Sequence, residues 1–570
     1  MASSSTSSEA IQHDTITQPA TAMTRALSNV SETMSLKTAP QQVPAAVPVA
    51  GKPSEKLQVE EPEDNIQYPS GPQVWLNLVA LLLVCFLHGL DLTIVAVAIP
   101  SLTNEFKTIA DIGWYSAVYG LIFSATNFFF GKLYTMFELK RLLIISVLIF
   151  ELGSVICTFA QSSKMFILGR AIAGVGAAGQ GAGCMTFIPR CFPTHKRPLM
   201  NGFLGFAQSF GLVSAPLIGG ALIDAFTWRA CFGINVPVGV FAVAIIAYGV
   251  KDPSSLPDMS LPMREKLRRT DPIGTLLVIP SIVCLMIGLQ WGGRRYGWND
   301  WRIILVFVLF ATLATVFAYT QYKQQDKAVL PPRILKNRTV LACALFSLCT
   351  NGVLATTEYY ISIYFQGVRG YSATRSGVLG LPMIVGLAVC SLCASLLTTV
   401  IGWYTPSMII CAVLTPIASG LITTIDLDDK PVKVAGLLGF LGAAVGFAAQ
   451  APYTAVMTVV SPKDVSIALG VLIFGAGIGS SLSVAASAAL FQDRLGAEIA
   501  KSAPGTNTTD LGSHGLSDIR SAVGADRLKE VLFGYNEAVV QTLYFPLGLG
   551  LLTIIATAFI EVKSVKKKKE

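Results

Sequence analysis

The stretch WLNLVALLLVCFLHGLDLTIVAVAI, residues 75–99, determines the fold class. It is apolar over the roughly twenty residues that an α-helix needs to cross a bilayer, and its only charged residue is Asp91. About fourteen such stretches follow one another between Trp75 and Val562. The sequence therefore predicts an all-α integral membrane protein whose function depends on the few polar residues within its spans.

The composition supports this class. Hydrophobic residues make up 52% of the chain and charged residues 13%, with a mean hydropathy of +0.59, whereas soluble domains are about a quarter charged. The net charge is +8, but much of the excess lies in short connectors beside the spans and in the tail Lys566–Lys569. No compact basic domain is present, so nucleic acid is not an expected partner. Most of the eleven cysteines lie inside spans, which predicts packing and no metal site.

The predicted spans fall into groups of six, two and six, and this grouping divides the chain. The spans are 75–99, 113–133, 142–160, 165–188, 199–223 and 231–250, then 273–291 and 303–321, then 340–363, 376–400, 406–425, 434–457, 467–490 and 541–561. The predicted regions are a disordered cytoplasmic tail (1–71), an N-terminal six-helix bundle (72–252), a linker with two extra transmembrane helices (253–337), a C-terminal six-helix bundle (338–562) and a basic cytoplasmic tail (563–570).

The orientation follows from the lysine and arginine residues of the connectors. Their bias favours a cytoplasmic N-terminus. This topology places the loop 491–540 outside, where the sequon at Asn507 is predicted to be glycosylated. The sequons at Asn29 and Asn337 fall inside and are expected to stay unmodified.

Four charged residues within the spans need an explanation, because a charge at bilayer depth costs several kcal/mol. They are Asp91, Glu151, Arg170 and Glu358. Each carboxylate either binds protons or substrate, or has a structural role as the partner of an arginine or as a residue near the interface. Both interpretations stay open for Asp91 and for Glu358, a structural role is favoured for Glu151, and Arg170 either pairs or snorkels.

Two glycine-rich segments predict different structural features. The GxGxxG pattern of Gly174–Gly179 lies within an apolar helix without a preceding strand, so it predicts close helix packing and no nucleotide site. In the fifth span, Pro216 is expected to kink the helix, while Gly211, Gly219 and Gly220 allow a neighbouring helix to approach. Kinked, glycine-rich helices suit a transporter that moves between two states.

Four contiguous motifs stand out in the first six spans. They are LDLTIVAVAIP (90–100), LGRAIAGVG (168–176), SAPLIGG (214–220) and WRACFGINVP (228–237). They resemble, in this order, the first-helix signature, the conserved-arginine motif of helix four, the antiporter motif of helix five and the entry to helix six of one family. That family is the major facilitator superfamily, in particular its fourteen-helix drug:proton antiporter branch as found in fungi, and the resemblance covers about residues 72–562.

The loop after the second span departs from the family pattern. It reads GKLYTMFELKR (131–141), with Thr135 in place of the usual aspartate and Glu138 in place of a glycine. Gly131, Lys140 and Arg141 are still assigned to the conformational motif, together with the helix-five residues.

The resemblance implies two six-helix bundles related by pseudo-twofold symmetry, with two inserted helices. It also implies export of hydrophobic small molecules, such as a secondary metabolite, toxin or drug, by proton antiport and alternating access. No cofactor is expected, because the proton gradient supplies the energy. The implied coupling or substrate residues are Asp91, Arg170 and Glu358. The expected partners are the substrate, protons and the lipid bilayer.

Two alternatives remain. A proton-coupled uptake carrier, such as a siderophore importer, shares the fourteen-span plan. A membrane enzyme is disfavoured, because the four histidines are widely separated along the chain. The plasma membrane is the expected location, with a vacuolar or other internal membrane as the alternative, and Lys567–Glu570 fits a KKxx retrieval pattern.

Overall fold

The computed structural model describes residues 71–107, 111–249, 262–292, 296–325, 328–503 and 525–566. Within these ranges the chain forms helices, turns and two isolated bridges, and no strand. Thirteen of the described helices are long and apolar enough to cross a membrane. This architecture confirms the predicted all-α membrane fold. The predicted glycosylation site Asn507 and the tail Lys567–Glu570 lie outside the described residues.

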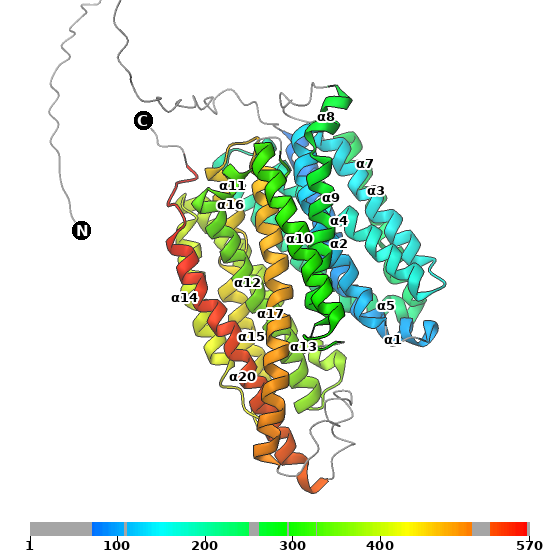
Figure 1. The fold of residues 1–570 in the computed structure, drawn as a ribbon, viewed down its shortest axis with the longest axis vertical. Helices are drawn as coiled ribbons and strands as arrows, with labels where there is room; N and C mark the ends of the chain where they lie inside the picture. The colour runs from blue at the N-terminus through cyan, green and yellow to red at the C-terminus, as the bar shows by residue number, and fades with distance from the viewer. Residues whose placement is uncertain are drawn as a thin grey trace, which may run out of the picture. The chain divides into compact units, whose positions relative to one another are not determined.

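The helices of the predicted N-terminal bundle pack against one another in pairs (Figure 1). α3 and α2 both contact α4, and α1 contacts α5 and α7. The predicted sixth span consists of two helices, α6 and α7, which meet at Ile234. The bounds are α1 Pro72–Phe106, α2 Ile112–Met136, α3 Leu139–Thr158, α4 Ser163–Cys191, η2 Thr194–Lys196, α5 Arg197–Ala225, α6 Trp228–Gly233 and α7 Asn235–Gly249.

α2 occupies the place of the second predicted span but is not among the thirteen apolar helices. It is 25 residues long, which is sufficient to cross a bilayer. Its sequence includes Ser124, Thr126 and Asn127, and these side chains are buried between helices. Because α2 packs against α4 and α17, its faces are covered by protein, so it tolerates polar residues that a lipid-facing helix would not.

The predicted C-terminal bundle is built around α12 and α20. α17 packs against both, α14 packs against α20, and α13 packs against α15. The twelfth predicted span is broken into α15 and α16. The bounds are α12 Arg338–Ile363, followed directly by the π-helical turn η5 Tyr364–Val368, α13 Ala373–Ile401, α14 Thr405–Ile422, α15 Pro431–Gly446, α16 Ala451–Val459, α17 Val465–Ser502 and α20 Ala525–Ala558.

The described parts of the predicted loop 491–540, residues 491–502 and 525–540, are helical, which corrects the ends of the flanking spans. α17 continues to Ser502 and α20 begins at Ala525. These extensions carry polar residues, so hydropathy alone did not include them in the spans. They are nevertheless stabilised by burial, because Ile499 from α17 packs with Val531 and Tyr535 from α20 in one hydrophobic cluster.

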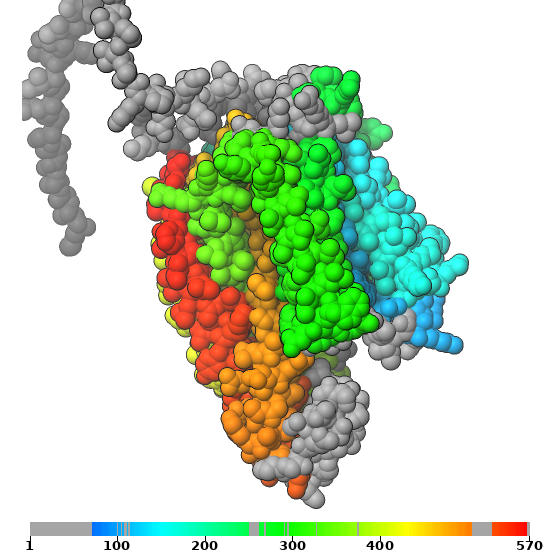
Figure 2. Space-filling view, viewed as in Figure 1, coloured from blue at the N-terminus to red at the C-terminus, as the bar shows by residue number. Residues whose placement is uncertain are grey.

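The two extra helices lie beside the seam between the halves. α9 (Pro272–Trp291) contacts α2 and α17, which come from different halves, and α10 (Trp301–Gln324) packs against α9. Figure 2 shows them as a green surface between the cyan helices and the orange α17. The outermost of the two, α10, is largely exposed, as expected for a helix in contact with lipid. The short helices α8 (Met263–Arg269) and α11 (Pro332–Leu335) flank this pair.

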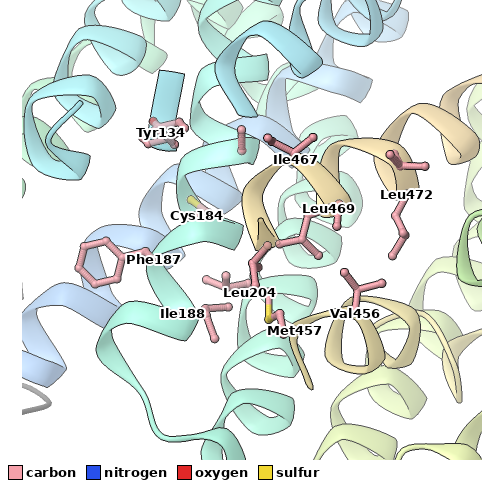
Figure 3. Packing of buried hydrophobic residues seen from close by; sticks show 14 of the residues in the cluster. Tyr134, Cys184, Phe187, Ile188, Leu204, Val456, Met457, Ile467, Leu469 and Leu472 are labelled. Atoms are coloured by element: carbon pink, nitrogen blue, oxygen red, sulfur yellow. The ribbon is translucent and has the colours of Figure 1, made fainter. Parts of the chain in front are cut away.

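The halves meet through a hydrophobic cluster at one end of the bundle. This is the end at which α1 begins, which we call the inner end because the basic residues predict it to be cytoplasmic. Figure 3 shows Phe187 and Ile188 of α4 and Leu204 of α5 next to Met457 of α16 and Ile467 of α17. We call this contact region the inner seal.

Candidate functional site

A cavity of about 350 Å³ lies between the two halves, within the size range of small-molecule sites. Most of its lining comes from the C-terminal half. The lining residues are Thr93, Gly205, Gln208, Ser209, Leu212, Ser347, Thr350, Asn351, Leu354, Ala355, Glu358, Met383, Ile384, Leu387, Ser391, Val445, Ala448, Ala449, Gln450, Pro452, Tyr453 and Ser480.

One face of α12 supplies the polar wall of the cavity. Ser347, Thr350, Asn351 and Glu358 are spaced by three, one and seven residues, so they lie on one side of the helix. The Glu358 side chain is exposed, and no lysine, arginine or histidine is found among the described residues that line the cavity. The structure therefore places the predicted site residue Glu358 in the cavity without a cationic neighbour in its wall.

The break between α15 and α16 also opens onto the cavity. Ala448, Ala449 and Gln450 leave the α-helical path there, and Pro452 lies in the first turn of α16. Irregular backbone at membrane depth is tolerated where it lines a cavity. The sequence analysis missed these residues, although Pro452 within an apolar span was a signal for a broken helix.

Asp91 and Arg170 lie together inside the N-terminal half and do not line the cavity. An Arg170 Nη atom donates to an Asp91 carboxylate oxygen at 2.6 Å, and both residues are fully buried. Asn235 donates to the other carboxylate oxygen at 3.3 Å, and Arg170 Nε donates to the Tyr115 carbonyl at 3.2 Å. The guanidinium also lies 4.4 Å from the centre of the Tyr119 ring. This geometry matches the ion-paired alternative that the sequence left open for Asp91.

Glu151 is the second buried carboxylate among the four charged residues predicted within the spans. It lies on α3 against α7, where a Cβ atom at Gly239 would lie 1.9 Å from Oε1. Neither carboxylate oxygen has a hydrogen-bond partner among the described residues. Because Gly239 has no side chain, the Glu151 carboxylate fits against α7.

The residues of the helix-five motif differ in what they contact. A Cβ atom at Gly211 would lie 2.3 Å from the Phe86 carbonyl oxygen, and one at Gly219 would lie 3.1 Å from an Ile94 carbon, so both glycines bring α5 against α1. A Cβ atom at Gly220 would meet no atom within 4 Å, and Pro216 is exposed. The close approach of α5 to α1 thus depends on Gly211 and Gly219.

The motif 131–141, predicted to be a loop, covers the end of α2 and the start of α3, and its residues make three separate contacts. A Cβ atom at Gly131 would lie 3.1 Å from the Ser466 carbonyl oxygen of α17, so this glycine lies at a contact between the halves. Lys140 donates to the Ala247 carbonyl at 2.6 Å, and Arg141 forms an exposed ion pair with Glu138 at 2.8 Å.

Arg197 is an inner-seal residue that the sequence analysis missed. It is buried and donates to the carbonyl oxygens of Pro189 (3.3 Å) and Phe192 (3.1 Å) at the end of α4. It also donates to the Met457 carbonyl of α16 at 3.1 Å, so one guanidinium joins helix C-termini from both halves. An arginine in the short connector before the fifth span was the available signal, but Met457 lies 260 residues further along the chain, so the sequence did not show this contact.

Comparison with known proteins gives the same family as the motifs. The sequence model of the Major Facilitator Superfamily matches residues 81–484. The chain is 36% identical over 511 residues to the MFS-type efflux pump MFS1 of Arthroderma benhamiae, covering 90% of this chain and 95% of that protein. It is 37% identical to the efflux pump roqT of Penicillium rubens, with 86% and 90% coverage, and 35% identical to the thioclapurine efflux transporter tcpA of Claviceps purpurea, with 91% and 96% coverage.

Solved structures are similar to this chain in fold. Because their sequence identity to it is low, this similarity supports the fold alone. The human organic anion transporter MFSD10 has a TM-score of 0.57 at 13% identity, covering 86% of this chain and 100% of that chain. The proton:xylose symporter XylE has a TM-score of 0.56 at 13% identity, covering 87% and 97%. The chain therefore belongs to the major facilitator superfamily and is a multi-pass membrane transporter whose relatives include fungal efflux pumps.

Proposed function

We propose that this transporter exports hydrophobic small molecules, such as a secondary metabolite, toxin or drug, by proton antiport with alternating access. The observation that carries the proposal is the cavity between the halves, with the Glu358 carboxylate in its wall. The efflux activity named for the fungal relatives supports the direction of transport. The plasma membrane is the proposed location.

The inner seal supports a transport cycle in which the cavity is reached from alternate sides. Along α5, Arg197 and Asn201 belong to the seal, while Gln208, Ser209 and Leu212 line the cavity. The cavity therefore lies on the outer side of the seal. Opening the seal requires Arg197 to release the Met457 carbonyl and Asn201 to release the Thr454 hydroxyl, both of which belong to the other half.

We assign the proton-coupling role to two places. Glu358 is reachable from the cavity and can exchange a proton there. Asp91 and Arg170 form the second place, where protonation of Asp91 would weaken the ion pair and the packing of α1 against α4. Coupling then consists of proton binding that changes the relative stability of the two states of the transporter.

The experiment measures accumulation of neutral, cationic and anionic fluorescent dyes in cells that express the protein, with and without a proton uncoupler. We expect lower accumulation of at least one dye, and the uncoupler should abolish the difference from control cells. Higher accumulation would instead identify an uptake carrier. Export that persists with the uncoupler would rule out proton antiport.

Site variants complete the test. Asp91→Asn at matched surface levels should remove the uncoupler-sensitive export, because a neutral amide cannot bind and release a proton. Pro216→Leu should also lose transport, if α5 bends during the cycle. Unchanged uncoupler-sensitive export in Asp91→Asn would remove that residue from the coupling mechanism.

A further inference from the structure

A group of buried polar residues lies inside the N-terminal half, apart from the cavity. Its least explained member is Glu151 of α3, which is 7% exposed and does not line the cavity. Neither of its carboxylate oxygens has a hydrogen-bond partner among the described residues. A buried polar atom without a partner costs free energy, and a buried ionised carboxylate costs more, so this side chain requires a physical explanation.

The contact of α3 with α7 makes Glu151 a neighbour of Asn235. Glu151 and Ser154 are three residues apart on α3, and Asn235 and Gly239 are four apart on α7, so each pair lies on one face of its helix. Asn235 Nδ2 donates to Ser154 Oγ at 3.3 Å, and the Glu151 carboxylate lies against Gly239. These two contacts follow one another along the same helix interface, one turn apart.

The Asn235 side chain has a fixed orientation and an acceptor without a partner. Its amide nitrogen donates to Asp91 Oδ1 and to Ser154 Oγ, each at 3.3 Å. Turning the amide over would point its oxygen at the Asp91 carboxylate, so the nitrogen faces Asp91. Asn235 Oδ1 then has no donor among the described residues. The interface therefore holds three buried acceptor oxygens, two of Glu151 and one of Asn235, that lack a donor.

A proton on Glu151 supplies the missing donor. A carboxylic acid donates through its O–H, whereas an ionised carboxylate only accepts. The charges of the buried group also favour the neutral form. Asp91 is the charged group that acts on Glu151 electrostatically, and it is already paired with Arg170 at 2.6 Å. An ionised Glu151 would add a second carboxylate to a group with one guanidinium.

The helices packed against α3 supply no other cation for Glu151. α7 has no charged residue, and the one charged residue of α6, Arg229, forms an ion pair at 2.6 Å with a glutamate at the outer end of α1. On α4, Lys164 and Arg190 lie near the two ends of the helix, and Arg170 pairs with the α1 aspartate. A salt bridge therefore does not account for the burial of Glu151.

We propose that Glu151 is a proton-binding site of the N-terminal half, where it donates a hydrogen bond as a neutral carboxylic acid to Asn235 Oδ1 and so holds the Asn235 amide against Asp91. Glu151 is then a positioning residue, whose proton stays in place while other carboxylates exchange theirs. Its contacts come from one half alone, so relative movement of the halves leaves them intact. The inference rests on the proposed function only in taking Asp91 as a coupling residue.

Infrared spectroscopy of the purified full-length protein at neutral pH tests the bound proton. The wild-type spectrum minus that of Glu151→Gln should contain the carbonyl stretch of a carboxylic acid and lack carboxylate stretches. Glu105→Gln is the matched control, because Glu105 is ionised in its ion pair with Arg229, and its difference spectrum should contain carboxylate stretches. Carboxylate stretches in the Glu151 difference spectrum would overturn the proposal.

Two substitutions test the positioning role at matched surface levels. Glu151→Gln keeps a neutral donor for Asn235 Oδ1, whereas Glu151→Met removes it. Glu151→Met should reduce uncoupler-sensitive export about tenfold, the effect of leaving one buried acceptor unsatisfied, and Glu151→Gln should restore most of that loss. An equal loss in both variants would show that Glu151 must release its proton, and unchanged export in Glu151→Met would show that it positions nothing; either result would overturn the proposal.

The melting temperature gives a readout that needs neither substrate nor gradient. Glu151→Met should melt below Glu151→Gln, and this advantage of the glutamine should disappear when Asn235→Ala removes the acceptor. An advantage that persists without Asn235 would contradict the hydrogen bond. Failure of the infrared and melting experiments leaves proton-driven export intact, and failure of the dye experiment leaves the proton on Glu151 intact.

Discussion

The two halves of this transporter place carboxylates in apolar helices in opposite ways. In the N-terminal half, Asp91 is fully buried, accepts from Arg170 and Asn235, and is absent from the cavity wall. In the C-terminal half, the exposed Glu358 side chain faces the cavity without a described cationic partner. A paired buried charge holds helices in one arrangement, whereas an unpaired charge at a cavity is available to a ligand or a proton. The partner of a carboxylate, more than its presence in a span, therefore distinguishes the two residues.

The largest expected effect comes from breaking the buried pair. Asp91→Asn leaves the Arg170 guanidinium buried and uncompensated, and arginine cannot lose its proton to become neutral. We expect a loss of about 3–5 kcal/mol in stability. Thermal unfolding in detergent, followed by size-exclusion chromatography, measures it.

Removing both charges should recover much of this loss. In Asp91→Asn combined with Arg170→Met no buried charge is left unpaired, so the double variant should melt closer to the wild type than Asp91→Asn alone. A double variant less stable than either single variant would show that the two residues are not stabilised mainly by each other.

The second-largest expected loss of stability is at the contact of α5 with α1, beside the buried pair. Gly211→Ala forces a Cβ atom to within 2.3 Å of the Phe86 carbonyl oxygen, which should destabilise the protein by about 1–3 kcal/mol through overpacking. Gly220→Ala is the matched control on the same helix, because open space surrounds that position. It should be neutral or slightly stabilising, and equal melting temperatures for the two variants would contradict the close α1–α5 contact.

A smaller, pH-dependent effect is expected at the far end of α1. Arg229 and Trp228 donate hydrogen bonds to the Glu105 carboxylate, which lower the pKa of Glu105 below its ordinary value of 4.5. Because the folded-state pKa is the lower one, this stabilisation is present above pH 4.5 and is lost as pH falls through the folded-state pKa.

The melting temperature as a function of pH checks this sign. Wild type should melt above Glu105→Gln at neutral pH, and the difference should shrink as pH falls below 4.5. A difference that grows with acidity would contradict the predicted direction. Because the pair is partly exposed, high salt should also reduce the difference.

The smallest expected change in stability is at Glu358. Because its side chain faces the cavity and has no described ion-pair partner, Glu358→Gln should alter stability by no more than about 0.5 kcal/mol. The same variant should lose proton-driven export. A melting temperature that drops as far as that of Asp91→Asn would remove the distinction between the two carboxylates.

Sequence reasoning predicted the membrane fold and the family well, because both depend on local features. Apolar length identifies a span without knowledge of its neighbours, and the motifs at 90–100 and 228–237 are contiguous. Sequence reasoning predicted the helix ends less accurately where a helix continues past its apolar segment. The extension of α17 to Ser502 carries charged residues, and its stability comes from packing against α20. The six, two and six grouping and the site roles remain predictions.

Within the site, each of the four charged residues was identified from the sequence, but their partners were not. Hydropathy shows that a charge at bilayer depth needs a partner or a function, and it cannot distinguish the two. Asp91 and Arg170 are 79 residues apart, so only the packing of α1 beside α4 brings them together. Arg197 was missed for the same reason, since the carbonyl oxygens that it contacts belong to helix ends from both halves.

Span length, span polarity and contiguous motifs are properties of short segments, so the sequence alone identifies this chain as a membrane transporter of the major facilitator superfamily. The pairing of Asp91 with Arg170, and the place of Glu358 in a cavity with no cationic residue among its described lining, depend on the tertiary structure. The energy of a charge depends on the groups within a few ångströms of it, and helices distant in the sequence supply those groups.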